Sequence, residues 1–135
     1  MMTVGIIDTN TLILVERLDG DDLPDEPVIT AITLAELSVG PLVATDDRER
    51  AARQARLQEA ESVFEPLPFD AAAARAFGGV AASLRRSGRK PSSRAFDALI
   101  AATAIANQLP LYTCNPRDYL GIDGLDLVEL PHPAA

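Results

Sequence analysis

The sequence contains one cysteine, one histidine and one lysine, and it has no tryptophan. With a single cysteine, Cys114, no internal disulfide can form, and a zinc site built on thiolates is implausible. The single histidine, His132, lies in a proline-rich stretch at positions 130–133. A hydrolase built on a Ser-His or Cys-His pair needs a histidine in its core, so this class of enzyme is disfavoured.

Long apolar runs are missing as well. No run reaches the roughly 18 residues of a membrane span, and no basic segment followed by a long apolar stretch opens the sequence. We therefore expect a cytoplasmic protein without a membrane partner. The length of 135 residues predicts one domain over 1–135, with a loose tail over 130–135.

Positive charge is also scarce, since 12 Lys and Arg residues against 20 Asp and Glu residues give a net charge of −8. A strongly acidic surface argues against a nucleic-acid partner, because phosphates favour a basic surface. The argument weakens if the acidic residues gather at a metal site, where a bound cation inverts the local charge.

Short apolar runs alternate with helical patterns along the chain. The segments expected as strands are 4–7, 27–30, 111–113 and 127–129, and those expected as helices are 12–17, 33–40, 46–64, 71–86 and 95–107. In the third of these helices, Leu57, Ala60, Val63 and Phe64 share the face expected to be buried. This alternation predicts an α/β fold with a mostly parallel sheet of about four or five strands, flanked by helices.

The first strand ends in a carboxylate, Asp8. Thr9, Asn10 and Thr11 follow it with side chains that favour the start of a helix. Asp8 is therefore expected where the first strand gives way to the first helix, at the carboxyl edge where open α/β sheets bind ligands. Folding alone does not require a charge at the end of a buried strand, so we interpret Asp8 as part of a functional site.

Three further acids, Glu36, Asp97 and Asp118, are expected near the same edge, because each follows a strand or opens a helix. Structural interpretations stay open for two of them. Glu36 can close a capping box with Thr33, and Asp118 can stabilise the first turn of a helix capped by Asn115.

Asp97 is harder to explain structurally, because it belongs to the least polar helix of the chain. A carboxylate in such surroundings needs a partner, and Arg94 is the only close cation in the sequence. Several carboxylates without histidine are typical of sites for Mg²⁺ or Mn²⁺, which prefer oxygen ligands. The reaction that such ions commonly assist is phosphodiester hydrolysis.

Four motifs in this order resemble those of PIN-domain ribonucleases, and more narrowly those of the VapC toxins of bacterial type II toxin–antitoxin systems. The motifs are IDTN (7–10), TLAEL (33–37), FDALIAATA (96–104) and TCNPRDY (113–119). The resemblance implies a PIN fold, endoribonuclease activity that depends on Mg²⁺ or Mn²⁺, an RNA substrate, a VapB-like antitoxin and a homodimer. Position 119 departs from the usual pattern, because it carries Tyr119 where phenylalanine is common.

The resemblance also assigns roles to individual residues. The core acids of the family match Asp8, Glu36 and Asp97, and its fourth acid matches Asp118; of these, Asp8, Asp97 and Asp118 are the expected metal ligands. The supporting polar positions are Thr9, Asn10, Thr113 and Asn115.

A basic segment precedes Asp97 in the chain. Its members are Arg85, Arg86, Arg89, Lys90 and Arg94. They are candidates for contacts with an RNA backbone beside the acidic site, although a solvated basic loop explains the same pattern.

Two other functions remain as alternatives. A phosphoryl-transfer enzyme could use Asp8 as its nucleophile, but the second aspartate expected two residues further on is replaced by Asn10. A module without catalytic activity could bind a cation or a partner through the same acids. Such a module is expected to lack at least one core acid, and this sequence retains all of them.

Overall fold

A short strand, β1 (Val4–Ile7), lies at the centre of the sheet. It pairs in parallel with β2 (Glu26–Val28) on one side and with β3 (Leu111–Thr113) on the other, and β4 (Leu127–Glu129) pairs in parallel with β3. The computed structural model describes residues 2–90 and 94–134. The four-stranded sheet confirms the predicted α/β class.

Five α-helices among the described residues connect and cover the strands. They are α1 (Thr9–Ile13), α2 (Ala31–Val39), α3 (Asp47–Val63), α4 (Ala71–Arg86) and α5 (Ala95–Ala106), and the 3-10 turns are η1 (Val15–Arg17), η2 (Gly20–Asp22), η3 (Gly40–Val43) and η5 (Pro116–Tyr119). Within the described residues, 2–90 and 94–134, no helix has the length and apolar character needed to cross a membrane.

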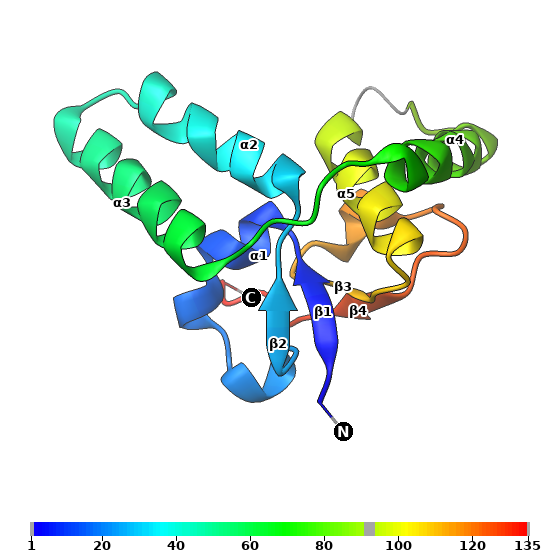
Figure 1. Ribbon diagram of the computed structural model, residues 1–135, viewed down its shortest axis with the longest axis horizontal. Coiled ribbons are helices and arrows are strands. Elements are labelled where there is room, and N and C mark those ends of the chain that lie inside the picture. The colour runs from blue at the N-terminus through cyan, green and yellow to red at the C-terminus, as the bar shows by residue number, and fades with distance from the viewer. Residues whose placement is uncertain (1, 91–93, 135) are drawn as a thin grey trace.

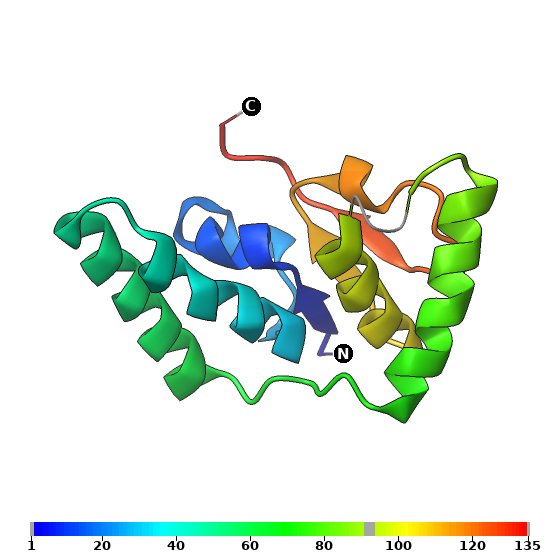
Figure 2. The ribbon, with the colours of Figure 1, turned by 90° about the horizontal axis from the view of Figure 1, so that it is seen from above.

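The helices form two groups on opposite sides of β1 (Figure 1). Seen from above, α2 and α3 lie side by side in one group, and α4 and α5 lie side by side in the other (Figure 2). Ile7, on one face of β1, packs with Leu37 of α2 and Ala60 of α3. Ile6, on the other face, packs with Ile100 of α5. Both faces of β1 are therefore buried, as its continuous apolar sequence predicts.

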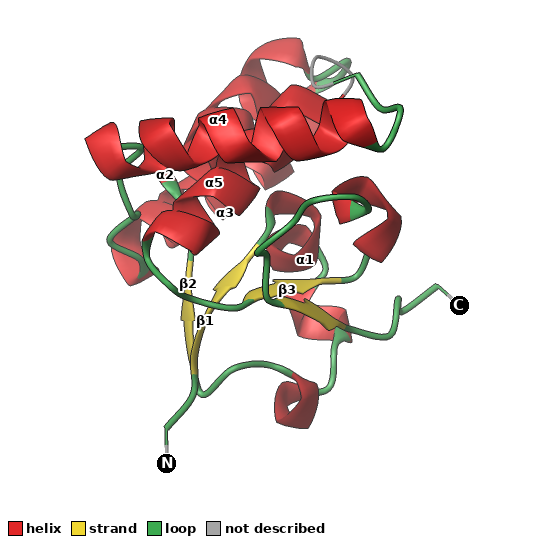
Figure 3. Cartoon of the chain, turned by 90° about the vertical axis from the view of Figure 1, so that its right-hand side faces the viewer, coloured by secondary structure: helices red, strands yellow, loops and turns green. Residues whose placement is uncertain are grey.

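The helix α4 makes no such contact with β1 and instead packs on α5. Val80 and Leu84 of α4 form a buried cluster with Ala98 and Ala102 of α5, and the side view shows α4 lying above α5 (Figure 3). Because α5 is covered by the sheet on one side and by α4 on the other, it is buried almost all round. This explains the uniformly apolar sequence of the helix that carries Asp97.

The structure corrects several predicted boundaries. The second strand ends at Val28, where position 30 was expected, and the first α-helix ends at Ile13, with the separate turn η1 after it. Val63 of α3 is 65% exposed, so its predicted place in the core is wrong. At the other end of the chain, Leu130 is buried and its N–H donates to the carbonyl of Thr113, so the chain is held in place through this residue.

Candidate functional site

Asp8 is positioned by the junction between β1 and α1. Its backbone is extended, and its Oδ1 accepts a hydrogen bond from the Thr11 N–H at 3.1 Å, so Asp8 caps α1. The carboxylate thus has a structural role that the sequence interpretation did not foresee. A cap alone does not explain the rest of its environment, because Asp8 is only 3% exposed and accepts two further hydrogen bonds.

Two hydroxyl groups converge on the other oxygen of this carboxylate. The Thr113 hydroxyl donates to Asp8 Oδ2 at 2.7 Å, and the Tyr119 hydroxyl donates to the same oxygen at 2.9 Å. Thr113 ends β3 and Tyr119 ends η5, so the carboxyl end of the neighbouring strand supplies both donors. Three donors fix the orientation of the Asp8 carboxylate.

Glu36 is brought to the same edge by α2. The hydroxyl of Thr9 donates to Glu36 Oε1 at 2.7 Å and lies 3.0 Å from the hydroxyl oxygen of Thr33. The structure excludes the alternative of a capping box between Thr33 and Glu36, because α2 begins at Ala31 and Thr30 caps it by accepting from the Thr33 N–H. Glu36 therefore makes a contact across the site that helix capping does not account for.

Asp97 is the acid with the most strongly perturbed titration. Burial raises its pKa to about 6, and the negative charges of Asp118, Asp8 and Glu36 contribute to the rise in that order. The guanidinium of Arg94 opposes the rise. Burial also raises the pKa of Glu36, and the charge of Asp8 adds to that effect. The four acids are therefore close enough to repel one another, as expected for a shared site.

Asp118 has its own cationic neighbour. Its Oδ1 lies 3.3 Å from the Arg94 guanidinium, and its side chain is 16% exposed. Arg94 was expected as the partner of Asp97, but the contact that the structure shows is with Asp118. The side chain of Asn115 makes no capping hydrogen bond to η5, so the expected cap at this position is absent.

The carboxyl edge of the sheet faces the region between the two helix groups. In Figure 1 the arrowheads of β1 and β2 point toward this region, and the first turn of α5 lies beside it. Asp8 follows β1 and Asp118 follows β3, whereas Glu36 lies on α2 and Asp97 lies in the first turn of α5. Asn10, one of the expected supporting residues, is exposed beside Asp8.

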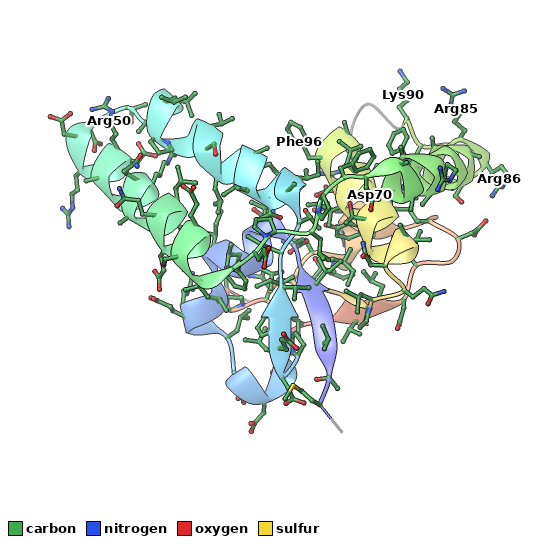
Figure 4. The ribbon with its side chains drawn as sticks, viewed as in Figure 1. Arg50, Asp70, Arg85, Arg86, Lys90 and Phe96 are labelled. Carbon is green, nitrogen blue, oxygen red and sulfur yellow. The ribbon has the colours of Figure 1, made fainter. Side chains whose placement is uncertain are left out.

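The basic residues divide into different environments. Arg86 pairs with Asp123 at 2.9 Å, and Arg89 donates to the carbonyl of Arg117 at 3.0 Å. Figure 4 shows Arg85, Arg86 and Lys90 directed outward at the far end of α4, whereas Phe96 marks the start of α5. Among the described basic side chains considered for RNA contacts, Arg94 is the one in contact with an acid of the site.

The donor set fits a divalent cation in its chemistry. Every candidate ligand is a carboxylate oxygen, which Mg²⁺ and Mn²⁺ prefer. Burial raises the pKa of Asp97, and neighbouring negative charge that Arg94 does not fully compensate adds to the rise. Within residues 2–90 and 94–134, however, no group of three acidic, histidine or cysteine side chains is already arranged to hold a metal ion.

A separate hollow of about 380 Å³ lies between α1, η1 and α3. Its walls are mostly apolar and include Leu12, Ile13 and Phe64, and none of the four site acids lines it. Its charged lining residues are Glu16, Arg56 and Glu59, which lie away from the acids that follow β1 and β3. The acids at the carboxyl edge remain the candidate active site.

The Tyr119 hydroxyl and Thr33 are site residues that the sequence interpretation missed. Tyr119 was treated as a core ring equivalent to phenylalanine, and Thr33 as a helix cap. The replacement of phenylalanine by tyrosine was the available signal for the first, because a buried hydroxyl needs a partner. No pattern in the sequence distinguished Thr33 from an ordinary capping residue.

Comparison with known proteins agrees with this fold. The family model described as PIN domain matches residues 6–121. Ribonuclease VapC5 of Mycobacterium tuberculosis is 39% identical over 129 residues, which covers 93% of each chain, and Ribonuclease VapC of Rickettsia bellii is 28% identical over 130 residues, which covers 93% of this chain and 96% of that protein.

Solved structures give the same result. A chain in the crystal structure of VapBC-5, a member of the VapBC family of toxin–antitoxin systems from M. tuberculosis, matches with a TM-score of 0.83 and 34% identity, over 95% of this chain and 99% of that one. VapBC2 from Rickettsia felis, bound to a DNA fragment from its promoter, matches with a TM-score of 0.73 and 25% identity, over 93% and 97% of the two chains. This chain belongs to the PIN-domain family. Within that family, its relatives are the VapC proteins of toxin–antitoxin systems.

Proposed function

We propose that this chain is an endoribonuclease that depends on Mg²⁺ or Mn²⁺, acts as the toxin of a toxin–antitoxin pair and is inhibited by a cognate VapB-like antitoxin. The observation that carries the metal-dependent chemistry is the raised pKa of Asp97, which burial and, after it, the negative charges of Asp118, Asp8 and Glu36 bring to about 6. The substrate class and the antitoxin are supported by relatives named as VapC ribonucleases and by neighbours from VapBC systems.

The residues that would hold the cation are Asp8, Asp97 and Asp118. When bound, a divalent cation neutralises the charge on a phosphate and lowers the pKa of a bound water. Asp8 contributes a carboxylate that Thr11, Thr113 and Tyr119 already hold in one orientation. Such preorganisation reduces the cost of arranging ligands when the cation and the RNA bind.

Glu36 and Arg94 have roles of a different kind. Glu36 has a raised pKa and is oriented by the Thr9 hydroxyl, which suits it to accept a proton from the attacking water. The guanidinium of Arg94 is half exposed next to Asp118, where it can bind a phosphate of the RNA backbone.

The alternative in which Asp8 is a covalent nucleophile is less consistent with its environment. A nucleophilic carboxylate needs an oxygen that the substrate can reach. Asp8 is 3% exposed, and each of its oxygens already accepts at least one hydrogen bond. Its environment suits a held ligand better than a nucleophile.

RNA cleavage tests the proposal directly. The purified chain is incubated with a fluorogenic RNA in EDTA, in Mg²⁺ and in Mn²⁺, and with a phosphatase substrate under the same conditions. We expect RNA cleavage only with a divalent cation and no phosphatase activity. Cleavage of the phosphatase substrate alone would support the nucleophile mechanism, and inactivity toward both would support a module that only binds.

Inhibition is tested with the partner encoded beside this gene. We expect the two proteins to purify together at low salt, with a basic side chain from the C-terminal segment of the antitoxin reaching the four acids, because an Arg or Lys can replace the cation. Replacing that side chain by Ala should relieve inhibition of RNA cleavage. Separate purification of the two proteins at low salt would contradict this part of the proposal.

A further inference from the structure

One buried hydroxyl lies between the two central aspartates of the site. The Tyr119 oxygen is 2.9 Å from Asp8 Oδ2 and 3.4 Å from Asp97 Oδ1. Asp8 follows β1 and Asp97 belongs to α5, so the hydroxyl connects two acids that are far apart in the sequence. Phenylalanine is common at this position in the family that the sequence resembles, and phenylalanine has no hydroxyl group.

The ring that carries this hydroxyl is fixed by the core. Tyr119 is 2% exposed and packs in a buried cluster with Ile6 of β1, Leu111 of β3 and Ile100 of α5. A ring enclosed by three elements cannot turn away without disrupting their packing. The hydroxyl is therefore a rigid point, and both aspartate oxygens lie within 3.4 Å of it.

We propose that Tyr119 is a positioning residue of the metal site, whose hydroxyl holds Asp8 and Asp97 toward a common point and so raises the affinity for the divalent cation. This inference rests on the proposed function. Tyr119 does not contact RNA in this account, because the side chain is almost fully buried. It acts through the two carboxylates, as the hydrogen-bond partners of metal ligands do in other metal sites.

A phenol suits this role better than a charged group would. A neutral donor orients the Asp8 carboxylate without neutralising it, so the attraction for the cation is retained. Thr113 supplies a second hydroxyl to the same oxygen at 2.7 Å. Thr113 contacts only Asp8 among the four acids, whereas Tyr119 contacts both Asp8 and Asp97 in the described structure.

The test is Tyr119→Phe in the full chain, with Mn²⁺ binding measured by calorimetry in the absence of RNA. Phe keeps the buried ring and removes only the hydroxyl. We expect Mn²⁺ affinity to fall about 10-fold or more, the typical effect of removing a partner of a metal ligand. RNA cleavage should fall at limiting Mn²⁺ and recover at excess Mn²⁺, with KM for RNA unchanged.

The matched control is Tyr112→Phe, which removes the hydroxyl of the only other tyrosine. Tyr112 lies on β3 with its ring beside Gly5, and none of its described hydrogen bonds involves the four acids. We expect this variant to bind Mn²⁺ as the wild type does.

Three results would overturn the inference, and they separate it from the proposed function. In the first, the wild type binds Mn²⁺ and cuts RNA, and Tyr119→Phe binds Mn²⁺ with the same affinity. This result would reject the role of Tyr119 and leave the proposed function intact. An equal loss of affinity in Tyr112→Phe, or failure of Tyr119→Phe to fold, would assign the hydroxyl to general stability. Wild-type protein that does not bind Mn²⁺ would reject the metal site itself, and this inference with it.

Discussion

The two aspartates near the Tyr119 hydroxyl, Asp8 and Asp97, have opposite kinds of surroundings. Three hydrogen-bond donors surround the Asp8 carboxylate, whereas burial and neighbouring negative charges raise the pKa of Asp97 to about 6. The first carboxylate is held by its environment, and the second is disfavoured by it. Changes at these two positions should therefore have different effects on stability, although both should abolish RNA cleavage.

For Asp8→Asn we expect a loss of stability of about 1–2 kcal/mol in EDTA. The amide oxygen can still accept from the Thr11 N–H, but the charge-assisted bonds from Thr113 and Tyr119 are weakened. Urea unfolding with EDTA present measures the change. An unchanged midpoint would indicate that the hydrogen bonds to the Asp8 carboxylate do not stabilise the fold.

Asp97 should make the stability of the metal-free protein depend on pH. Its pKa is about 6 in the folded chain and about 3.9 when unfolded, so between these values the folded state binds more protons. Linkage then requires that the free energy of unfolding falls as pH rises from about 4 to about 6, and that the loss persists above pH 6. Because solvent partly screens this carboxylate, we expect a decline of about 1–2 kcal/mol.

The control for this dependence is Asp97→Asn, which does not titrate. The difference in unfolding free energy between wild type and variant, measured in EDTA from about pH 4 to about pH 7.5, should decline between the unfolded and the folded pKa of Asp97 and level off above the folded value. Parallel curves for the two proteins would contradict the raised pKa of Asp97.

At the scale of elements, the start of α2 determines where Glu36 lies. Thr30 is fully buried, and its hydroxyl oxygen accepts from the Thr33 N–H at 3.3 Å. This cap sets the first turn of the helix, and Glu36 follows on its second turn. Glu36 thereby comes within hydrogen-bond distance of Thr9 at the end of β1.

Thr30→Val should destabilise the protein by about 1 kcal/mol, because it removes the capping oxygen and keeps the shape of the side chain. Ser38→Ala is the control, since it removes an exposed hydroxyl from the same helix and should change stability by less than about 0.5 kcal/mol. Equal thermal midpoints for the two variants would show that the cap does not stabilise α2.

The arrangement of elements could be predicted because it depends on patterns that are local in sequence. The apolar run at 4–7, the helical pattern at 71–86 and the uniformly apolar segment at 95–107 each predicted the element observed. The start of α2 was missed because Thr30 and Thr33 are both acceptable caps, and tertiary packing decides between them. The exposure of Val63 was missed because an apolar face does not show where its helix leaves the core.

The four acids could be singled out for a similar reason, since parallel strands bring their carboxyl ends to one edge. The side-chain contacts of these acids could not be predicted from the sequence in the same way. The sequence paired Arg94 with Asp97 by proximity, whereas the structure pairs it with Asp118, which is brought near by β3 and η5. The Tyr119 contact likewise depends on how η5 packs against α5.

At the scale of the whole molecule, the net charge of −8 does not exclude an RNA partner. Some of the negative charge belongs to four acids that would face a cation, and basic side chains lie at the far end of α4 (Figure 4). The homodimer that the family resemblance implies stays a prediction. Sedimentation of the purified chain alone and with its antitoxin measures the assembly.

We expect Asp97 to destabilise the metal-free protein and the acidic site to stabilise the protein once a cation binds. Repulsion and burial penalise Asp97 in the metal-free chain, whereas a ligand that binds only the folded state raises its stability, by about 2.7 kcal/mol at one hundred times Kd. Replacing Asp97 by Asn removes both effects, because it removes one negative charge and one metal ligand.

The most direct test is a thermal melt of wild type and Asp97→Asn, each with EDTA and with excess Mn²⁺. We expect the order of the two melting temperatures to depend on the cation. In EDTA the variant should melt at the same temperature as wild type or higher, and in Mn²⁺ wild type should melt higher than the variant. A variant that melts clearly lower in EDTA, and a wild type that gains nothing from Mn²⁺, would show instead that Asp97 stabilises the fold and that the site does not bind a cation.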